Sequence, residues 1–414
     1  MYVIRLFFIK EMKMTREELL NLKIDAPDPA MYAAAKAKLD AIAKPLDSLG
    51  VFEDIIARCG AILGTPEPEL RQRAIITMIA DNGVVAEGIS QSGQDVTAAV
   101  AISLGKRKSS VCRMAKVTGT DMIPVDIGVN GDDVYPGVLS RKVMKGTRDF
   151  YVEPAMTEDE VMEAISTGIE LAGTCKGQGY TMLGTGEMGI GNTTTSCAVC
   201  AALLGMQVKD IVGRGAGASD AILARKTDVI IEGIRKYGFS AAEDPVDISL
   251  MGGFDPGMTT YVSEDQNALI EDAIEANEWE AKKTPDPFEV LRCVGGLDIA
   301  GLVGVFIGGA LFHIPVVIDG VISGAAALLA ESLVPGTKEF MIASHLGAEP
   351  ALPVMLEKLG LTAVIDARLA LGEGTGCAMF MAMLDTALAV CEDPTNFDDI
   401  AVEQYVRFDE EPAE

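Results

Sequence analysis

The sequence predicts an α/β protein built on a parallel sheet with helices on its faces. Four apolar runs, at residues 74–83, 122–131, 180–189 and 315–324, each reach a glycine or aspartate and then give way to a helical pattern. This repeated order of strand, polar loop and helix is typical of parallel sheets. Ligands bind such sheets at the carboxyl ends of the strands, where these glycines and acids lie. The chain has 414 residues, 49% of them hydrophobic, which is enough for a large core.

An alanine-rich segment ahead of the first strand predicts helices over residues 15–62, with a break at Pro45. Thr15 is placed to cap the first helix, and Glu18 stands at the spacing of a capping box. Residues 1–14 are expected to be a disordered tail or an upstream start.

Two segments of the second half differ from the sheet pattern. The apolar stretch 299–317 contains several glycines, so we expect a buried helix and strand there rather than a membrane span. Residues 261–283 are acidic and amphipathic and include the single tryptophan, Trp279, which predicts an exposed inserted helix. The segment 244–255 echoes 286–298, either as a local duplication or by chance.

The composition disfavours several classes of function. A net charge of −27 opposes binding to nucleic acid or to an anionic membrane, so the expected partners are small molecules. The eight cysteines lack the spacing of a disulfide framework, which indicates a reduced, cytoplasmic protein. Cys197 and Cys200 form a CxxC pair inside an apolar helical run, without a second pair or paired histidines. We therefore predict no metal site and no cofactor.

The segment GTGEMGIGNTTTS, residues 184–196, has the composition of a phosphate-binding loop. It partly matches the GxGxxG and P-loop patterns, but Asn192 stands in place of the P-loop lysine, which disfavours a kinase or ATPase. The remaining interpretation is a glycine-rich backbone close to an anion at a helix N-terminus, and the alternative is a turn that only packs. Glu187 would repel a phosphate, so we expect it to serve a sugar hydroxyl or a cationic centre of the same ligand.

A second glycine-rich loop, GRGAGASD at residues 213–220, precedes Lys226 on a predicted helix. The two loops together suggest one phosphate held from two sides. For Lys226 alone, a solvated surface lysine is an equal alternative.

These motifs resemble, in order and spacing, the nicotinate-nucleotide–dimethylbenzimidazole phosphoribosyltransferase family, which makes the α-ribazole phosphate of the lower loop of cobalamin. KPLDSLG (44–50) is similar to an early motif of the family, and the resemblance covers roughly residues 25–405. The stretches that carry it are ADNGVVAEGISQSGQDVT (80–97), LGTGEMGIGNTTT (183–195), VGRGAG (212–217), GGLDIAGLVG (295–304), IDGVISGAAAL (318–328), SHLGAEP (344–350) and LGEGTGCA (371–378).

The resemblance implies roles for particular residues. Glu373, in LGEGTG, matches the general base toward the ring nitrogen of the incoming base, and Glu187 matches a second acid near the reacting ribose. The lower base would lie against Ser90, Gln94 and Leu371. The residues that would hold the phosphate and ribose of the mononucleotide are Gly189, Gly191, Asn192, Thr193, Thr194, Gly215, Gly217, Lys226, Asp319 and Ser323.

The resemblance also implies a Rossmann-like α/β domain, a small helical domain built from both chain ends, and a homodimer. The expected division is a tail at 1–14, a helical part at 15–62, a large α/β domain at 63–345 with an acidic insertion at about 243–283, a second helical part with the catalytic loop at 346–405, and an acidic tail at 406–414.

The chemistry of this reaction agrees with the residues. The leaving group of nicotinate mononucleotide is a pyridinium that departs neutral, so neither a general acid nor a metal is required. The attacking benzimidazole must lose its N–H proton, which one positioned carboxylate can accept. A second carboxylate can stabilise the oxocarbenium-like ribose, and direct displacement inverts C1′.

Several positions depart from the family pattern. Asn82 stands where the family commonly has histidine, Leu46 and Asp47 replace a Pro-Gly pair, and the segment 344–352 lacks the usual Arg-Ser and Gly-His. Phosphoribosyl transfer is therefore the first expectation, with a purine or phenolic base as an alternative acceptor. A nucleotide-binding subunit that is inactive without a partner is the second hypothesis.

Overall fold

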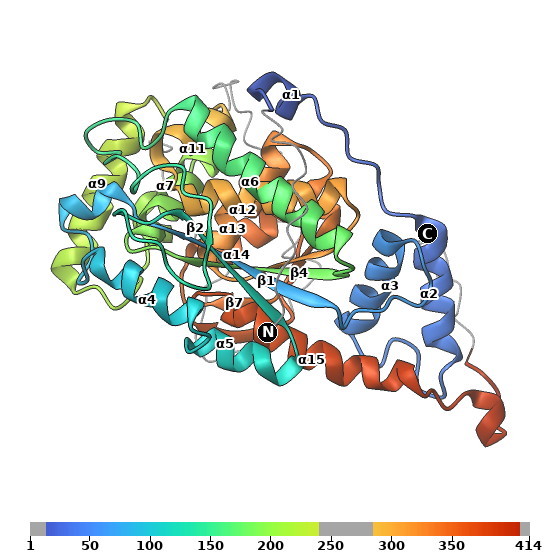
Figure 1. Cartoon of the computed structure of the whole chain (residues 1–414). Helices are drawn as coiled ribbons and strands as arrows, with labels where there is room; N and C mark the ends of the chain where they lie inside the picture. The colour runs from blue at the N-terminus through green and yellow to red at the C-terminus, as the bar shows by residue number, and fades with distance from the viewer. Residues whose placement is uncertain (1–13, 240–284, 406–414) are drawn as a thin grey trace, which may run out of the picture.

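The computed structural model describes residues 14–239 and 285–405, and its centre is a six-stranded parallel sheet (Figure 1). The strand order is β3-β2-β1-β4-β5-β6, and every neighbouring pair is parallel. The strands are β1 (Arg73–Ala80), β2 (Asp121–Gly128), β3 (Leu139–Ser140), β4 (Met182–Met188), β5 (Val316–Ile318) and β6 (Met341–Ala343). The four strands expected from the sequence are β1, β2, β4 and β5, so the predicted parallel α/β class is confirmed.

The burial of β1 explains why its sequence is almost continuously apolar. All eight of its residues are buried. Ile76 and Met78 belong to the core on one face of the sheet, whereas Ile75 and Ile79 belong to the core on the other face. A strand covered by helices on both faces needs apolar side chains in both directions, so the alternation of a half-exposed strand is lost.

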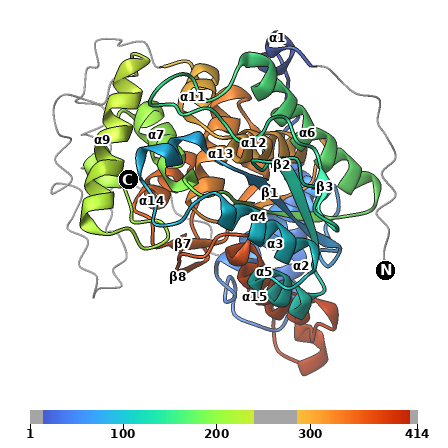
Figure 2. The same cartoon turned by 60° about the vertical axis from the view of Figure 1, so that its left-hand side comes forward.

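Helices cover both faces of the sheet (Figures 1 and 2). On one face, α6 (Glu158–Gly177) and α12 (Leu297–Leu311) pack closely, because a Cβ atom at Gly304 would lie 2.0 Å from the carbonyl oxygen of Ile165. On the opposite face lie α5 (Ser110–Ala115) and α15 (Thr375–Glu392). Further α-helices are α4 (Asp95–Gly105), α7 (Asn192–Leu204), α8 (Val208–Ile211), α9 (Asp220–Lys236), α11 (Pro287–Val294), α13 (Val321–Leu333) and α14 (Ala351–Leu359).

Short elements complete the chain. A two-stranded parallel sheet pairs β7 (His345–Gly347) with β8 (Ile365–Leu369). The 3-10 helices are η1 (Gly83–Glu87), η2 (Lys116–Thr118), η4 (Thr337–Phe340) and η5 (Phe397–Ile400).

The N-terminal helices lie beside the end of the chain (Figure 1). The helices α1 (Arg16–Leu20), α2 (Pro29–Ala41) and α3 (Val51–Leu63) confirm the helical prediction for 15–62, and Pro45 falls between α2 and α3. Phe52 of α3 stacks on Phe380 of α15, with ring centroids 6.4 Å apart. This contact supports a helical part built from both ends, although the domain boundaries themselves stay predictions. The expected capping box of Thr15 and Glu18 is present.

The apolar stretch 299–317 forms most of α12 and the beginning of β5, both of them buried, as predicted. Among the described residues, only α15 is long and apolar enough to cross a membrane by length and composition. Half of α15 is buried, and it packs against β4 and α5 as a core helix does. The predictions for 244–255, for 261–283 with Trp279, and for the extreme tails fall outside the described residues.

Candidate active site

Two acids meet at the carboxyl edge of the sheet. Glu187 lies near the end of β4, and Glu373 lies in the loop that leads into α15. The N–H of Glu373 donates to the carbonyl oxygen of Glu187 at 3.1 Å. A Cβ atom at Gly186 would lie 2.5 Å from the carbonyl oxygen of Glu373, so the loop fits against β4 only because Gly186 has no side chain.

The loop around Glu373 has an unusual backbone. Glu373 has φ 62°, and its neighbours Gly372 and Gly374 have φ 78° and 97°. A non-glycine residue in the left-handed region is uncommon and marks a segment that its surroundings hold in place.

Asp319 provides much of that support. Its carboxylate, just after β5, accepts hydrogen bonds from the N–H groups of Gly374 (3.1 Å), Gly376 (2.6 Å) and Cys377 (3.3 Å). It therefore caps the N-terminus of α15 directly behind Glu373. Ser323, predicted with Asp319 to face the nucleotide, is fully buried and its hydroxyl pairs with that of Thr185.

The carboxyl group of Glu373 is buried and has one oxygen free of protein partners in the described part of the chain. The residue is 8% exposed, and its Oε2 has no hydrogen-bond partner among the described residues. Burial raises the pKa of Glu373 above its ordinary 4.5, while the Ser109 hydroxyl and the Val111 N–H, at the start of α5, act to lower it. A buried carboxylate with a free oxygen can accept a proton from a bound ligand.

Glu187 is held by an amide. The side-chain NH₂ of Asn192, on the first residue of α7, donates to Oε2 of Glu187 and, at 2.9 Å, to Oδ2 of Asp298. Burial raises the pKa of Glu187 to about 8, and the charges of Asp298, Asp319 and Glu373 act in the same direction. The hydrogen bond from Asn192 opposes this rise because it favours the ionised form.

Lys226 forms a second centre, which we call the cradle: Thr193, residues 213–217 and Lys226. The ammonium group of Lys226 is buried and donates to Oγ1 of Thr193 (2.8 Å) and to the carbonyl oxygen of Gly213 (2.9 Å). Burial lowers the pKa of Lys226, and the charge of Glu349 partly offsets this. In the described part of the chain, Lys226 makes no salt bridge. The prediction of a solvated surface lysine is therefore wrong.

The carboxylate of Glu349 binds the backbone of the cradle. Its Oε1 accepts the N–H of Gly215 at 2.8 Å. A Cβ atom at Gly213 would lie 2.0 Å from Oε2 of Glu349. Gly215 and Gly217 have φ 54° and 90°, the left-handed backbone that their glycines permit. The loop thus already binds one carboxylate, as backbone N–H groups bind anions generally.

The N-terminus of α7 joins the acids to the cradle. Gly191 is the N-cap residue with φ 93° and provides no side-chain cap. The side chains of the first two helical residues bind different groups: Asn192 binds the acids and Thr193 binds Lys226. Gly189 lies against β1, where a Cβ atom would meet the carbonyl oxygen of Ala80 at 2.2 Å.

Thr194, which was predicted to hold the nucleotide, lies inside the protein in this structure. Its side chain is fully buried, and its hydroxyl has no hydrogen-bond partner in the described part of the protein. Several of the ten residues predicted for the nucleotide bind protein groups in this structure, namely Asn192, Thr193, Gly215, Lys226, Asp319 and Ser323.

The residues predicted for the lower base come from two loops. Gln94 donates to the carbonyl oxygen of Asn82 at 3.2 Å and accepts from Asn130 at 2.8 Å. Ser90, close by in the chain, accepts the N–H of Ser92. Leu371 lies on the Glu373 loop and is 54% exposed.

The loop that carries Ser90 and Gln94 also reaches the cradle, because the side-chain amide of Gln91 donates to the carbonyl oxygen of Gly217. The base loop and the cradle are therefore directly connected.

Sequence reasoning missed Asp298, Glu349 and Ser109 as members of the site. Asp298 could have been noticed, because it is the single charged residue of α12, LDIAGLVGVFIGGAL. A lone buried acid opening an apolar helix needs partners, which indicates a polar site. No local signal singles out Ser109, which faces Glu373 only through the tertiary fold.

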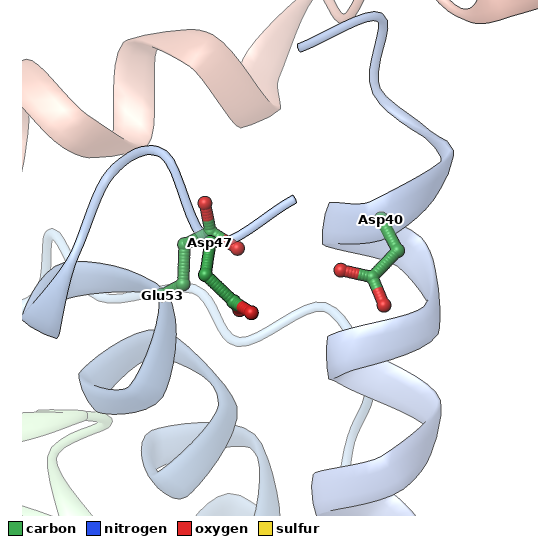
Figure 3. A group of neighbouring side chains, drawn as sticks. All are labelled: Asp40, Asp47 and Glu53. Atoms are coloured by element: carbon green, nitrogen blue, oxygen red, sulfur yellow. The ribbon is translucent and has the colours of Figure 1, made fainter. Parts of the chain in front are cut away.

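A separate acidic group consists of Asp40, Asp47 and Glu53 (Figure 3). Glu53 is buried, but Lys44 donates to it at 2.6 Å, and Lys36 bridges it to Asp47. Because these lysines already pair with Asp47 and Glu53, we assign no cation to the group.

Other residues weighed for chemistry are structural. Cys197 and Cys200 are buried free thiols of α7, and burial raises the pKa of Cys197 to about 12. His313 packs edge-on against Phe340, with ring centroids 5.3 Å apart.

Comparison with known proteins adds independent findings. The phosphoribosyltransferase family model matches residues 24–263 and 256–402. A nicotinate-nucleotide–dimethylbenzimidazole phosphoribosyltransferase of Clostridium perfringens is 37% identical over 376 residues, 91% of this chain and 92% of the relative. One of Acetivibrio thermocellus is 40% identical over 368 residues, 89% and 93% of the two chains. The crystal structure of CobT from Thermus thermophilus superposes with a TM-score of 0.75 at 32% identity, covering 91% of this chain and 100% of that one.

Proposed function

The chain belongs to the nicotinate-nucleotide–dimethylbenzimidazole phosphoribosyltransferase family, and from this premise we propose its reaction. It moves the phosphoribosyl group of nicotinate mononucleotide to dimethylbenzimidazole, giving α-ribazole 5′-phosphate and nicotinate for the nucleotide loop of cobalamin. One nitrogen of the base forms a bond to C1′ as the bond from C1′ to the pyridinium nitrogen breaks. The electron pair of the broken bond returns to the pyridine ring, and the base loses one proton.

A single structural observation carries the proposal. Asn192 and Thr193 are consecutive at the N-terminus of α7, yet Asn192 binds Glu187 and Thr193 binds Lys226. In a nucleoside monophosphate one ester linkage joins the sugar to the phosphate, so the two groups need adjoining parts of a binding site. An anion site at a helix N-terminus, adjoining a pair of acids, matches that arrangement.

The phosphate would bind at the cradle. Lys226 has a buried ammonium group with two neutral hydrogen-bond acceptors, Thr193 and Gly213. A buried cation of this kind favours an anionic ligand, because a charge removed from water is stabilised by an opposite charge. The N–H groups at Gly215 and Gly217 would add hydrogen bonds once Glu349 releases the loop.

Glu373 would accept the proton of the base. Its free Oε2, its burial and its raised pKa suit a group that must be ionised before the attack and protonated after it. Glu187 would face the ribose, where a negative charge stabilises the positive charge that develops at C1′. The N–H of Glu373 fixes the spacing of the two backbones.

The acceptor base would lie between the Glu373 loop and the loop of Ser90 and Gln94. Asn82 supplies a carbonyl oxygen to Gln94 and so shapes that loop. This position differs from the family's usual histidine, so the panel of acceptors tested should extend to purines and phenols. We also propose that the protein is a cytoplasmic homodimer, in keeping with the family resemblance. Light scattering of the purified protein tests the dimer.

The test is product analysis by HPLC. The full-length protein is incubated with nicotinate mononucleotide and, in turn, dimethylbenzimidazole, benzimidazole, adenine and phenol. We expect an α-ribotide with dimethylbenzimidazole and base-dependent release of nicotinate. Mononucleotide binding without transfer to any base would overturn the enzymatic proposal in favour of a nucleotide-binding subunit.

A further inference from the structure

A bridge of three buried side chains lies behind the proposed ribose site. The amide of Asn192 donates one hydrogen bond to Glu187 and another to Asp298. The second oxygen of Asp298 accepts the N–H of Ile299 at 3.0 Å. All three side chains of the bridge are at least nine-tenths buried.

The orientation of Asn192 determines what it can bind. Its NH₂ group is directed at the two carboxylates rather than at the cradle, so its donors are not available to a phosphate there. The two acids, in turn, are held near each other by the two N–H donors of one amide nitrogen. Two carboxylates that share one amide in a buried setting influence each other's ionisation strongly.

We propose that Asp298 and Asn192 are positioning residues for the transfer reaction, which orient the carboxyl group of Glu187 and set its charge. This inference rests on the proposed function of Glu187 toward the ribose. Asp298 repels the ionised form of Glu187, whereas Asn192 stabilises that form by a hydrogen bond. The two residues therefore act on Glu187 in opposite directions.

The surroundings of Glu187 are acidic on each packed element. Asp298 comes from α12, Asp319 from the end of β5, and Glu373 from the loop before α15, and each raises the pKa of Glu187. Glu373 responds to a different set of groups, namely its burial, Ser109 and Val111. Substitutions at Asp298 or Asn192 therefore act directly on Glu187 and reach Glu373 only through the charge of Glu187.

The arrangement predicts the direction in which each substitution displaces the pH profile of the reaction. Asp298→Asn removes a like charge, which favours ionised Glu187 and moves the acid limb of the pH profile of kcat/KM to lower pH. Asn192→Ala removes a hydrogen bond to the carboxylate, which moves the same limb to higher pH. We expect a displacement of about one pH unit in each direction. A purely structural defect would lower the rate of both variants without opposite displacements.

The experiment measures kcat/KM for nicotinate mononucleotide from about pH 5 to about pH 9, a range that brackets the raised pKa of Glu187, in wild type, Asp298→Asn and Asn192→Ala. The Asp126→Asn variant is the control, because Asp126 is a buried acid of β2 that pairs with Lys142 and is not one of the charges that raise the pKa of Glu187. Adding Glu187→Gln to Asp298→Asn should abolish the displacement. The proposal would be overturned if the acid limbs of Asp298→Asn and Asn192→Ala coincide with that of wild type, or if both move in the same direction.

Failure of the proposed function gives a different result. If wild type transfers the phosphoribosyl group to no base, the reaction is wrong whatever the variants do. The bridge is then tested by the pH dependence of the affinity for nicotinate mononucleotide, measured by calorimetry in the same proteins. Opposite displacements of that dependence would support the bridge, and their absence would overturn it.

Discussion

The N–H of Glu373 donates to the carbonyl oxygen of Glu187 at 3.1 Å, and this bond ties the loop before α15 to the end of β4. The two acids are thus fixed through their backbones, and their carboxyl groups remain directed by other partners. Gly372 permits the approach, because a Cβ atom there would lie 2.3 Å from Oε1 of Glu187. The close backbone contact explains why an acid with a left-handed φ is held so firmly in this loop.

Replacing Glu373 by glutamine should remove the proton acceptor while preserving the shape of the side chain. We expect kcat to fall about 10²- to 10⁴-fold with little change in the affinity for nicotinate mononucleotide. Initial rates by HPLC and binding by calorimetry separate the two effects. In wild type, protonation of Glu373 at low pH adds to the fall in rate that protonation of Glu187 causes, since only the ionised form of Glu373 accepts a proton.

Glu357→Gln is the matched control for Glu373, because Glu357 is an exposed acid of α14. Its rate should equal that of wild type. Equal rates for wild type and Glu373→Gln would rule out Glu373 as the base.

Replacing Lys226 by methionine should weaken binding of the mononucleotide phosphate. Hydrogen bonds to charged groups contribute about 1.5–3 kcal/mol, which corresponds to roughly a 10- to 150-fold rise in KM. The defect should be much smaller with the riboside that lacks the phosphate. Lys209→Met, at an exposed lysine of α8, is the control. An equal defect with both substrates would mean that Lys226 supports the fold rather than the phosphate.

Replacing Glu349 by glutamine should strengthen mononucleotide binding. The carboxylate of Glu349 accepts the Gly215 N–H in the proposed phosphate site, so removing its charge removes a repulsion and leaves only the weaker amide oxygen to compete for that N–H. We expect a several-fold lower KM, about 1 kcal/mol, as for one hydrogen bond. Competition by inorganic phosphate should strengthen in parallel. A higher KM would show instead that Glu349 is needed to order the loop.

Replacing Asp319 by alanine should destabilise the protein as well as the loop that carries Glu373. Three N–H groups at the start of α15 lose their acceptor, and a lost helix cap or charged hydrogen-bond partner costs about 1–3 kcal/mol. Urea unfolding measures the loss. Asp393→Ala, at the exposed far end of the same helix, should stay within about 0.5 kcal/mol of wild type.

Ionisation of Glu187 should make the protein less stable at alkaline pH. The folded state raises the pKa of Glu187 to about 8 from 4.5, so the folded state binds this proton more tightly than the unfolded state does. The resulting stabilisation is fully present below pH 4.5 and is lost as the pH rises through about 8. Glu187→Gln should therefore lose less stability than wild type between about pH 5 and about pH 8.5 in urea unfolding. Equal losses of stability in wild type and Glu187→Gln over this pH range would contradict the expectation.

Much of the fold was predictable because its causes are local. β1, β2, β4 and β5 are continuous apolar runs that end in glycine or acid, and strands covered on both faces need such runs. The capping box of Thr15 was predictable for the same reason, since its two partners are three residues apart. The glycine loop before α7 and the acid Glu187 stood out as unusual residues in this segment, whereas Glu373 was expected from the family resemblance.

The tertiary structure decided what those residues bind. By itself the sequence predicted the sheet, the glycine-rich loops and the unusual acid Glu187, because spacing and composition encode local conformation, whereas the role of Glu373 came from the family resemblance. It could not show that Asn192 binds two carboxylates, that Asp319 caps α15 or that Glu349 lies on the cradle. Apart from the bond between Asn192 and Glu187, these contacts join segments that are distant in the chain, and their direction depends on how helices pack across the sheet. Burial, which raises the pKa of Glu187 and lowers that of Lys226, arises only from that packing.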